Sequence, residues 1–323
     1  MRFLYFGDGL WATRCLERLL KDGHECLGVV LRTKPTCSSL RKLAERFSIP
    51  IHAPPRVNEE GFVVLVKSLN PDLNISMSYD QIMKSPILDS TPYGFINCHA
   101  GKLPFYRGRN VVNWAIINGE AEIGLTIHYI DEGIDTGDII FQEMIPINWE
   151  DTYGTVLEKL EGKFPPLLAD SVSAIGQGGS PRLPQNLQTG SYCVRRKEGD
   201  EWIDWHSSSL NIYNKIRGIT HPGPGATTLY ESEKLLIWEA IYDPGWPQST
   251  GVPGTILANE QGGVRIQTGD STIIVKDINR EPDENVVLAK PDLPVGGRFY
   301  GGSNLHNVST PSPLLRSRIN SAN

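Results

Sequence analysis

Strand-like and helix-like patterns of apolar residues alternate along the first third of the chain. Residues 2–6 form a β-prone run that ends at Gly7, and apolar side chains then recur at helical spacing from Leu10 to Leu20. The same alternation predicts further strands at residues 26–31, 73–78 and 94–99 and further helices at residues 38–47 and 58–69. Strands that alternate with helices of about ten residues indicate right-handed βαβ units. We therefore predict an α/β domain with an open, doubly wound parallel sheet.

The pattern changes at residues 178–190, where periodicity is lost and Gly, Pro, Asn and Gln accumulate, as is typical of an interdomain linker. Beyond it, a helical stretch at residues 207–217 precedes short β-type runs at residues 226–230, 234–240, 254–258, 263–268 and 271–278. Short strands separated by turns favour a small barrel or sandwich. The sequence thus predicts a first domain over residues 1–185, a second domain over residues 191–285 and an irregular tail over residues 286–323.

The charge balance narrows the range of partners. The chain has 323 residues, enough for two domains of about 100–200 residues each. It carries 31 Lys and Arg against 37 Asp and Glu, a formal net charge of -6. Proteins that coat nucleic acid or anionic membranes need clustered basic side chains. The composition therefore argues against both kinds of partner.

Long apolar runs and cysteine motifs are missing from the sequence. No run approaches about 18 apolar residues, the length that crosses a bilayer, and the stretch between Met1 and Gly7 is short for a signal peptide. The 5 cysteines are scattered without a Cys-x-x-Cys motif, which predicts reduced thiols rather than disulfides or a zinc site. We expect a cytoplasmic protein without a metal.

The turn after the first strand reads Gly7-x-Gly9-x-x-Ala12, which fits a dinucleotide-binding fingerprint. The acidic residue that should follow the second strand is replaced by Arg32 and its neighbours. Arg32 would suit an NADP site. Alternatively, the small residues serve only the tight turn that any open α/β domain needs here.

Asn97 and His99 carry the strongest chemical signal in the chain. Side chains two apart on a strand face the same way, and this strand ends where parallel sheets place their ligand crevice. An amide donor beside an imidazole suits polarising a carbonyl and moving a proton. From these residues alone, a catalytic pair and a polar cap on the strand end are both open.

A second polar cluster follows the β-type run at residues 125–130. It contains Asp131, Glu132, Asp135 and Asp138 in two Gly-containing turns. Acidic turn residues commonly form solvated Asx-turns. Carboxylates on one short loop lack metal-binding partners of the expected type nearby, and His128 in the preceding strand is as well explained by a structural role.

Three ordered motifs, Asn97-x-His99, Leu103-Pro-x-Tyr-Arg-Gly108 and Asp135-Thr-Gly-Asp138, strongly resemble the folate-dependent formyltransferase family. Its members include methionyl-tRNA formyltransferase and the sugar-nucleotide N-formyltransferases. The resemblance continues to about residue 280. It implies a Rossmann-like formyltransferase core, an OB-like C-terminal domain, 10-formyltetrahydrofolate as formyl donor and tetrahydrofolate as product, with no nicotinamide cofactor.

The resemblance also implies a catalytic trio of Asn97, His99 and Asp135. His99 would accept the proton of the attacking amine and Asn97 would donate a hydrogen bond to the developing oxyanion. Asp135 would fix the tautomer of His99 and stabilise its imidazolium form. The loop at residues 76–83 resembles the folate-contacting loop of the family.

Folate contacts are expected at Gln81, Ile82 and Asp131, and acceptor contacts are expected at Tyr106, Arg107 and Arg109. Arginines suit a diphosphate through forked hydrogen bonds, and Tyr106 suits packing on a ring. The loop after Leu31 is short compared with the long basic loop of tRNA-acting relatives. The sequence therefore favours a nucleotide-linked amino sugar as acceptor.

Several alternatives stay open. Methionyl-tRNA is the second acceptor hypothesis, and a formyltetrahydrofolate hydrolase would share donor site and trio. A nucleic-acid-binding module on the second domain would use Trp202, Trp205 and Trp246 as stacking positions. A homodimer through the second domain is plausible for the family.

Overall fold

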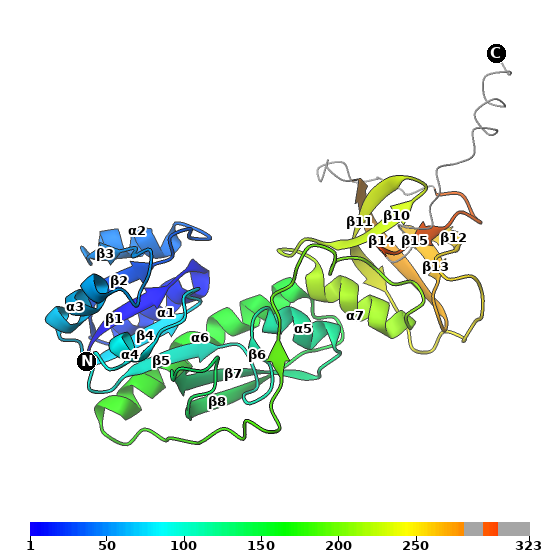
Figure 1. The fold of residues 1–323 in the computed structure, drawn as a ribbon. Coiled ribbons are helices and arrows are strands. Elements are labelled where there is room, and N and C mark those ends of the chain that lie inside the picture. Colours follow the sequence, from blue (N-terminus) through cyan, green and yellow to red (C-terminus); the bar gives the residue numbers. More distant parts are fainter. Residues whose placement is uncertain (281–292, 303–323) are drawn as a thin grey trace, which may run out of the picture. The chain divides into compact units, whose positions relative to one another are not determined.

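The computed structural model describes residues 1–280 and 293–302 and divides the chain into two compact units (Figure 1). The first unit comprises residues 1–115, 120–151 and 155–196, and the second comprises residues 116–119 and 152–154 and the described residues from Lys197 onward. The division falls after the expected boundary near residue 185, because residues 183–196 hydrogen-bond with loops of the first unit.

A seven-stranded sheet in the order β3-β2-β1-β4-β5-β7-β8 forms the centre of the first unit. Its strands are β1 (Arg2–Gly7), β2 (Glu25–Leu31), β3 (Ile51–His52), β4 (Leu73–Met77), β5 (Phe95–His99), β7 (Glu122–Tyr129) and β8 (Ile139–Pro146). The first five are parallel, as predicted, whereas β7 and β8 are antiparallel to their neighbours. The sheet is therefore mixed, because a short loop joins β7 to β8 where a parallel pair would need a crossover.

Helices cover both faces of this sheet, in agreement with the doubly wound prediction. The helices in this part of the chain are α1 (Gly9–Lys21), α2 (Ser39–Arg46), α3 (Glu60–Leu69), α4 (Ser85–Leu88), α5 (Val111–Ile117) and α6 (Tyr153–Gly176). Side chains of β1 alternate between the faces. Phe6 joins a buried cluster with side chains of α3 and α4, whereas Tyr5 donates a 2.9 Å hydrogen bond to the Ala12 carbonyl of α1. The Trp11 and Phe164 rings, 5.3 Å apart, join α1 to α6.

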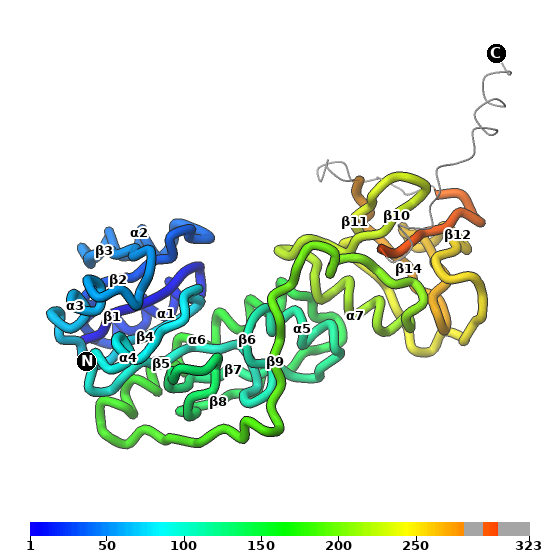
Figure 2. The backbone as a smooth tube through the Cα atoms, viewed as in Figure 1, coloured from blue at the N-terminus to red at the C-terminus, as the bar shows by residue number. Residues whose placement is uncertain are grey.

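A small two-stranded parallel sheet pairs β6 (Arg107–Gly108) with β9 (Tyr192–Cys193). Figure 2 shows β6 and β9 side by side, although 85 positions separate the paired residues Arg107 and Tyr192. β9 lies just beyond the predicted linker of residues 178–190, and both belong to the first unit, which extends to Arg196.

The second unit consists of α7 (Ser209–Ile219) and a six-stranded antiparallel sheet in the order β12-β13-β14-β11-β10-β15. Its strands are β10 (Ala226–Tyr230), β11 (Glu233–Ile241), β12 (Ile256–Glu260), β13 (Gly263–Gln267), β14 (Thr272–Arg280) and β15 (Phe299–Tyr300). The predicted β-rich second domain is confirmed, and its OB-like topology stays a prediction. β15 pairs with β10 within the segment expected to be an irregular tail, and residues 281–292 and 303–323 lie outside the described part.

The core of the second unit contains one of the tryptophans considered above. Trp205 is buried, packs against Phe299 with ring centroids 5.5 Å apart, and donates a 3.0 Å hydrogen bond to Thr228 Oγ1. A buried ring with a satisfied N–H is a core residue. Trp205 therefore offers no stacking surface for a nucleic acid.

Candidate active site

β5 positions Asn97 and His99 on one face at the carboxyl end of the sheet's parallel strands. β5 pairs in parallel with β4 on one side and antiparallel with β7 on the other, and the register sets Asn97 opposite His128. His99, the last residue of β5, is only 7% exposed. The two side chains thus project together from a strand fixed on both edges.

Asp135 reaches the same place from the loop between β7 and β8. Its Oδ2 accepts a 2.8 Å hydrogen bond from the Gly108 N–H and lies 3.6 Å from His99 Nδ1, and its Oδ1 lies 3.5 Å from Asn97 Nδ2. Asp135 has a left-handed φ of 53°, a conformation that costs free energy for a residue with a Cβ. The structure therefore brings the three residues of the predicted trio together.

The carboxyl group of Asp135 is ionised at neutral pH. Burial raises its pKa, but His99, His128 and the Gly108 N–H together outweigh burial and hold the pKa of Asp135 well below its ordinary value. The site thus contains a buried negative charge that faces an imidazole.

The tautomer of His99 is set by a backbone carbonyl. His99 Nε2 lies 2.7 Å from the Tyr106 carbonyl oxygen, which only accepts, so Nε2 carries the proton. Nδ1 is then the basic nitrogen, and it faces Asp135. In this geometry Tyr106, rather than Asp135, fixes the tautomer, because the carbonyl is the closer acceptor. A Cβ added at Gly101 would lie 2.4 Å from both His99 Nε2 and the Tyr106 oxygen, so this close contact needs glycine.

His99 is neutral at pH 7 and is thus able to accept a proton. Burial lowers the pKa of His99, the Asp135 charge raises it, and His128 lowers it further, with a net shift below the ordinary value. A proton that arrives at Nδ1 would be stabilised by the adjacent carboxylate.

His128 is a fourth polar residue of this site, which the sequence left as structural. Its Nδ1 lies 2.7 Å from the Tyr129 carbonyl, and its Nε2 lies 3.2 Å from Asn97 Nδ2 and 3.5 Å from Asp135 Oδ1. It orients the carboxamide of Asn97. The only sequence signal for His128 is its place in an alternating β-type run, and that pattern does not reveal which residue lies opposite His128 on the neighbouring strand.

Two of the expected folate residues lie in the loop between β4 and α4. Gln81 Oε1 accepts a 2.9 Å hydrogen bond from Val57 N, and its Nε2 donates to the Pro54 carbonyl at 3.1 Å. These bonds join the loop to residues 54–57. Ile82 is 57% exposed, so its apolar side chain is available to a ligand. Contacts of Gln81 and Ile82 with folate stay predictions.

Asp131 forms an Asx-turn at the start of the loop that carries Asp135. Its Oδ1 accepts hydrogen bonds from Gly133 N at 3.0 Å and Thr136 Oγ1 at 2.5 Å. Asp131 also lines a cavity of about 490 Å³ together with residues of α4, β5 and β7, among them Leu88 and Phe95. Over the part of the chain that the structure describes, no group of three or more His, Cys, Asp or Glu is arranged to hold a metal ion.

The three expected acceptor residues lie in different environments. The Tyr106 hydroxyl donates a 2.6 Å hydrogen bond to Glu120. Arg107 is only 2% exposed, and its guanidinium lies 4.0 Å from the centre of the Tyr192 ring. Arg109 is exposed and donates one 3.2 Å hydrogen bond to the Asp80 carbonyl. Arg109 is thus the more accessible of the two arginines.

The turn after β1 is filled by an acidic side chain. The carboxylate of Asp8 is buried, accepts hydrogen bonds from Thr36 N at 3.1 and 2.9 Å, and lies 3.3 Å from Arg32 Nη1. A carboxylate at this position would repel a phosphate. The arrangement fits the structural explanation of the Gly-rich turn.

A carboxamide, an imidazole and a carboxylate at the end of a buried strand are the groups that acyl transfer requires. The chain belongs to the formyl transferase family: the formyl transferase model matches residues 1–170, and the model of the formyl transferase C-terminal domain matches residues 196–287. It is an enzyme of the transferase class.

Among curated relatives, the methionyl-tRNA formyltransferase of Pelotomaculum thermopropionicum is 35% identical over 288 residues, which cover 86% of this chain and 90% of that protein. The methionyl-tRNA formyltransferase of Clostridioides difficile is 32% identical over 299 residues, 90% of this chain and 96% of that protein. These identities support the family assignment along nearly the whole chain.

Among solved structures, the sugar 3N-formyl transferase WlaRD, determined with dTDP and 5-N-formyl-THF, has a TM-score of 0.66 at 23% identity and covers 87% of this chain and 98% of that chain. The N-formyltransferase from Helicobacter canadensis, in complex with folinic acid and dTDP-3-aminofucose, has a TM-score of 0.64 at 22% identity, with coverage of 85% and 98%. Both likenesses show the fold. Among residues 1–280 and 293–302, no helix is both long enough and apolar enough to traverse a membrane.

Proposed function

We propose that this enzyme transfers the formyl group of 10-formyltetrahydrofolate to a primary amine. The observation that carries the proposal is the convergence of Asn97, His99 and Asp135, with contacts of 3.5 and 3.6 Å between their polar atoms. These residues come from β5 and from a loop 36 positions later in the sequence. Their meeting at one strand end supports a catalytic role over a simple strand cap.

His99 acts as the base. A primary amine is mostly protonated at pH 7 and attacks the formyl carbon only in its neutral form. The nitrogen that has attacked then carries a positive charge, so the site must take up one of its protons. Since the protonated Nε2 of His99 donates its hydrogen bond to the Tyr106 carbonyl, the proton from the amine arrives at Nδ1, directly or through water. Asp135 Oδ2, 3.6 Å away, stabilises the imidazolium that forms. His99 then donates this proton to the folate nitrogen as the bond between that nitrogen and the formyl carbon breaks, which releases the formylated amine and tetrahydrofolate.

Asn97 stabilises the charge on the formyl oxygen. One N–H of its carboxamide is directed to His128 Nε2 at 3.2 Å, and the second makes only a long contact of 3.5 Å with Asp135. A weakly held N–H at the strand end is available to a developing oxyanion. Removing one such donor typically costs about 10²–10³-fold in turnover.

The folate is the formyl donor. The relatives in the solved structures were determined with 5-N-formyl-THF and folinic acid, and in this chain Asp131 lies on the same loop as Asp135. The exposed side chain of Ile82 is suited to an apolar wall. Ile82 and Asp131 would thus hold the pterin, with Gln81 shaping the loop.

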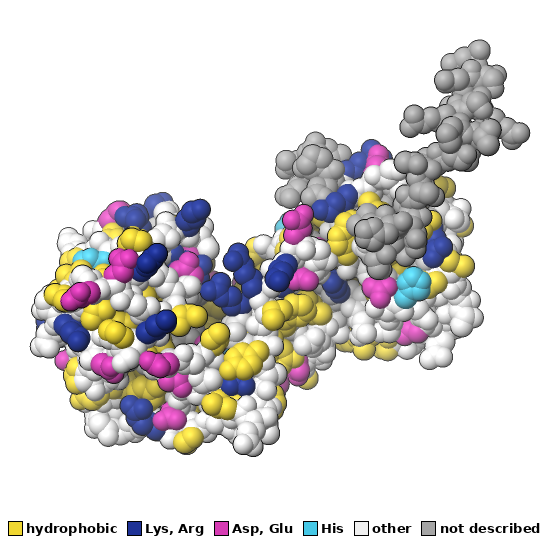
Figure 3. Space-filling view, in the orientation of Figure 1, with side chains coloured by type: hydrophobic (Ala, Val, Ile, Leu, Met, Phe, Trp, Pro, Cys, Tyr) yellow, Lys and Arg dark blue, Asp and Glu magenta, His cyan; other side chains and the backbone are white. Residues whose placement is uncertain are grey.

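The acceptor that we propose is a nucleotide-linked amino sugar. Arg109 offers an exposed guanidinium for the diphosphate of the acceptor. Arg107 is buried against the Tyr192 ring and would form part of the wall of the acceptor site. On the face shown in Figure 3, acidic and basic side chains of the first unit are interspersed rather than segregated. The net charge of -6 supports a small acceptor over a long polyanion.

Methionyl-tRNA is the second candidate acceptor, because the relatives named above, at 32–35% identity, are methionyl-tRNA formyltransferases. The short connection between β2 and α2 weighs against it. Arg32, which lies in this connection, already forms an ion pair with Asp8 and donates a hydrogen bond to the Ser78 carbonyl.

The deciding experiment incubates the enzyme with 10-formyltetrahydrofolate and, separately, a panel of nucleotide-linked amino sugars, initiator methionyl-tRNA and no acceptor. We expect a mass gain of one formyl group on one amino sugar. Formylation of methionyl-tRNA alone would establish the second candidate, and formate release without an acceptor would identify a hydrolase.

A further inference from the structure

The 183–196 segment, which is the last part of the first unit in the sequence, holds β6 along one edge. Ser191 accepts a 3.0 Å hydrogen bond from Arg107 N through its carbonyl and a 3.1 Å bond from Tyr106 N through its hydroxyl, and it donates a 3.2 Å bond to the Pro104 carbonyl. The Tyr192 ring lies under the Arg107 guanidinium. The backbone around Arg107 is therefore fixed from outside the site.

The opposite edge of β6 faces the catalytic residues. The Tyr106 carbonyl accepts from His99 Nε2, and the Gly108 N–H donates to Asp135 Oδ2. Along an extended strand, the polar groups of successive residues point to alternate edges. Residues 106–108 thus lie between the 183–196 segment and the catalytic pair.

The same segment also reaches the loop of Asp135. Gln185 Nε2 donates hydrogen bonds to the Asp135 carbonyl at 2.9 Å and to the Gly137 carbonyl at 2.7 Å. The orientation of the carboxamide is determined by this pair, because Oε1 in the place of Nε2 would face two carbonyl oxygens. Gln185 therefore supplies two donors to a turn in which Asp135 has a left-handed backbone.

We propose that Gln185 is a positioning residue for formyl transfer, which holds the backbone of Asp135 so that its carboxylate faces His99 Nδ1 and the Gly108 N–H. The inference rests on the proposed function for its kinetic test and on geometry alone for its spectroscopic test. Gln185 acts through the Asp135 and Gly137 carbonyls, so its contribution lies in geometry rather than in proton transfer.

The kinetic test compares Gln185→Ala and Gln185→Met with the wild type. Both variants remove the N–H donors, and methionine keeps the length of the side chain and thus the packing. We expect kcat to fall about 10–100-fold, the scale of a displacement of about 1 Å at a catalytic group, with the KM for the donor within about threefold. Gln177→Ala is the control, since Gln177 is exposed and its side chain bonds Ser173 at 3.2 Å on α6. It should keep wild-type kcat.

The spectroscopic test follows the His99 ring by NMR from pH 4 to 9 without substrates, with the signal assigned by its loss in His99→Gln. Burial lowers the pKa of His99, and of the charged and titratable groups that face it Asp135 raises the pKa and His128 lowers it. A displaced Asp135 therefore moves the midpoint to lower pH in both Gln185 variants and leaves it unchanged in Gln177→Ala.

A folded Gln185→Met protein, verified by thermal unfolding, with wild-type kcat and an unchanged His99 midpoint would overturn the proposal. If no acceptor is formylated even by the wild type, the proposed function fails while the His99 titration still decides the positioning role. If Gln185→Ala does not fold, the methionine variant gives both answers.

Discussion

Replacing Asp135 by asparagine removes the charge beside His99 and keeps the shape of the side chain. The Gly108 N–H requires an acceptor at the position of Oδ2, 2.8 Å away, so the asparagine oxygen should take this position. The variant therefore removes the charge while the hydrogen bond from the Gly108 N–H is kept.

The magnitude follows from the separation of 3.6 Å between His99 Nδ1 and Asp135 Oδ2. At an effective dielectric constant of about 20, an imidazolium and a carboxylate at this distance attract by about 4–5 kcal/mol. If about half of the charge has developed in the transition state, the loss is about 2 kcal/mol, or about 30-fold in kcat. In a serine-protease triad the same exchange costs about 10⁴-fold because it selects the wrong tautomer. Here the Tyr106 carbonyl keeps the tautomer, so the loss should stay far smaller.

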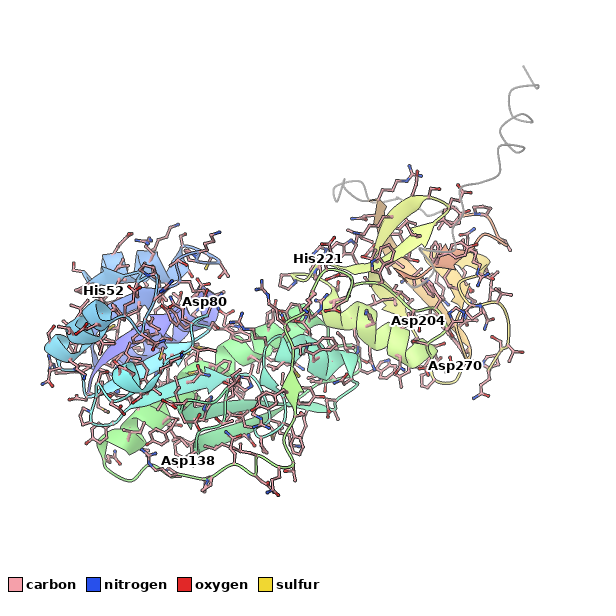
Figure 4. All side chains as sticks on the ribbon, viewed as in Figure 1. His52, Asp80, Asp138, Asp204, His221 and Asp270 are labelled. Atoms are coloured by element: carbon pink, nitrogen blue, oxygen red, sulfur yellow. The ribbon has the colours of Figure 1, made fainter. Side chains whose placement is uncertain are left out.

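The assay measures formylated acceptor by mass as a function of pH. Asp135 raises the pKa of His99, so in Asp135→Asn the acid limb of kcat, where His99 becomes protonated, should move to lower pH. Asp138→Asn is the matched control in the same loop: Asp138, labelled in Figure 4, is partly exposed and lies 3.8 Å from Arg182. It should change kcat less than about twofold. A 10⁴-fold loss in Asp135→Asn would refute the tautomer assignment, and wild-type activity would refute the role of the charge.

Three further predictions concern the same site. Asn97→Ala should fold normally and lose about 10²–10³-fold in kcat; steady-state activity close to wild type would exclude Asn97 as the oxyanion donor. Gly101→Ala should abolish transfer, because its Cβ would lie 2.4 Å from His99 Nε2 and the Tyr106 carbonyl; a crystal structure with this contact intact and full activity would contradict the geometry. The depressed pKa of Asp135 stabilises the folded protein above a pH of about 4, and this stabilisation is lost on acidification. The free energy of unfolding measured in urea should therefore fall less between pH 7 and pH 3 in Asp135→Asn than in the wild type. An equal fall in both proteins would contradict this contribution of Asp135.

The sequence predicted the elements that depend on local burial. β1, β2, β4 and β5 lie where apolar runs predict them, and the strands of the second unit from β10 to β14 follow the same rule. A strand that is buried on one face alternates apolar with polar residues, and a strand that is buried on both faces is a continuous apolar run. Either pattern can be recognised within a single segment of the sequence. Asn97 and His99 belong to this class, because their common face follows from their spacing on one strand.

Tertiary structure alone decided which groups meet at the strand end. The mixed direction of the sheet, His128 opposite Asn97 and the Tyr106 carbonyl on His99 depend on strand register and loop path. The same holds for Gln185, which the sequence placed in a linker. Local periodicity records whether a residue is buried, whereas its hydrogen-bond partners are chosen by segments far away in the chain. The resemblance in motif therefore predicted the trio, and only the folded chain revealed what holds it in place.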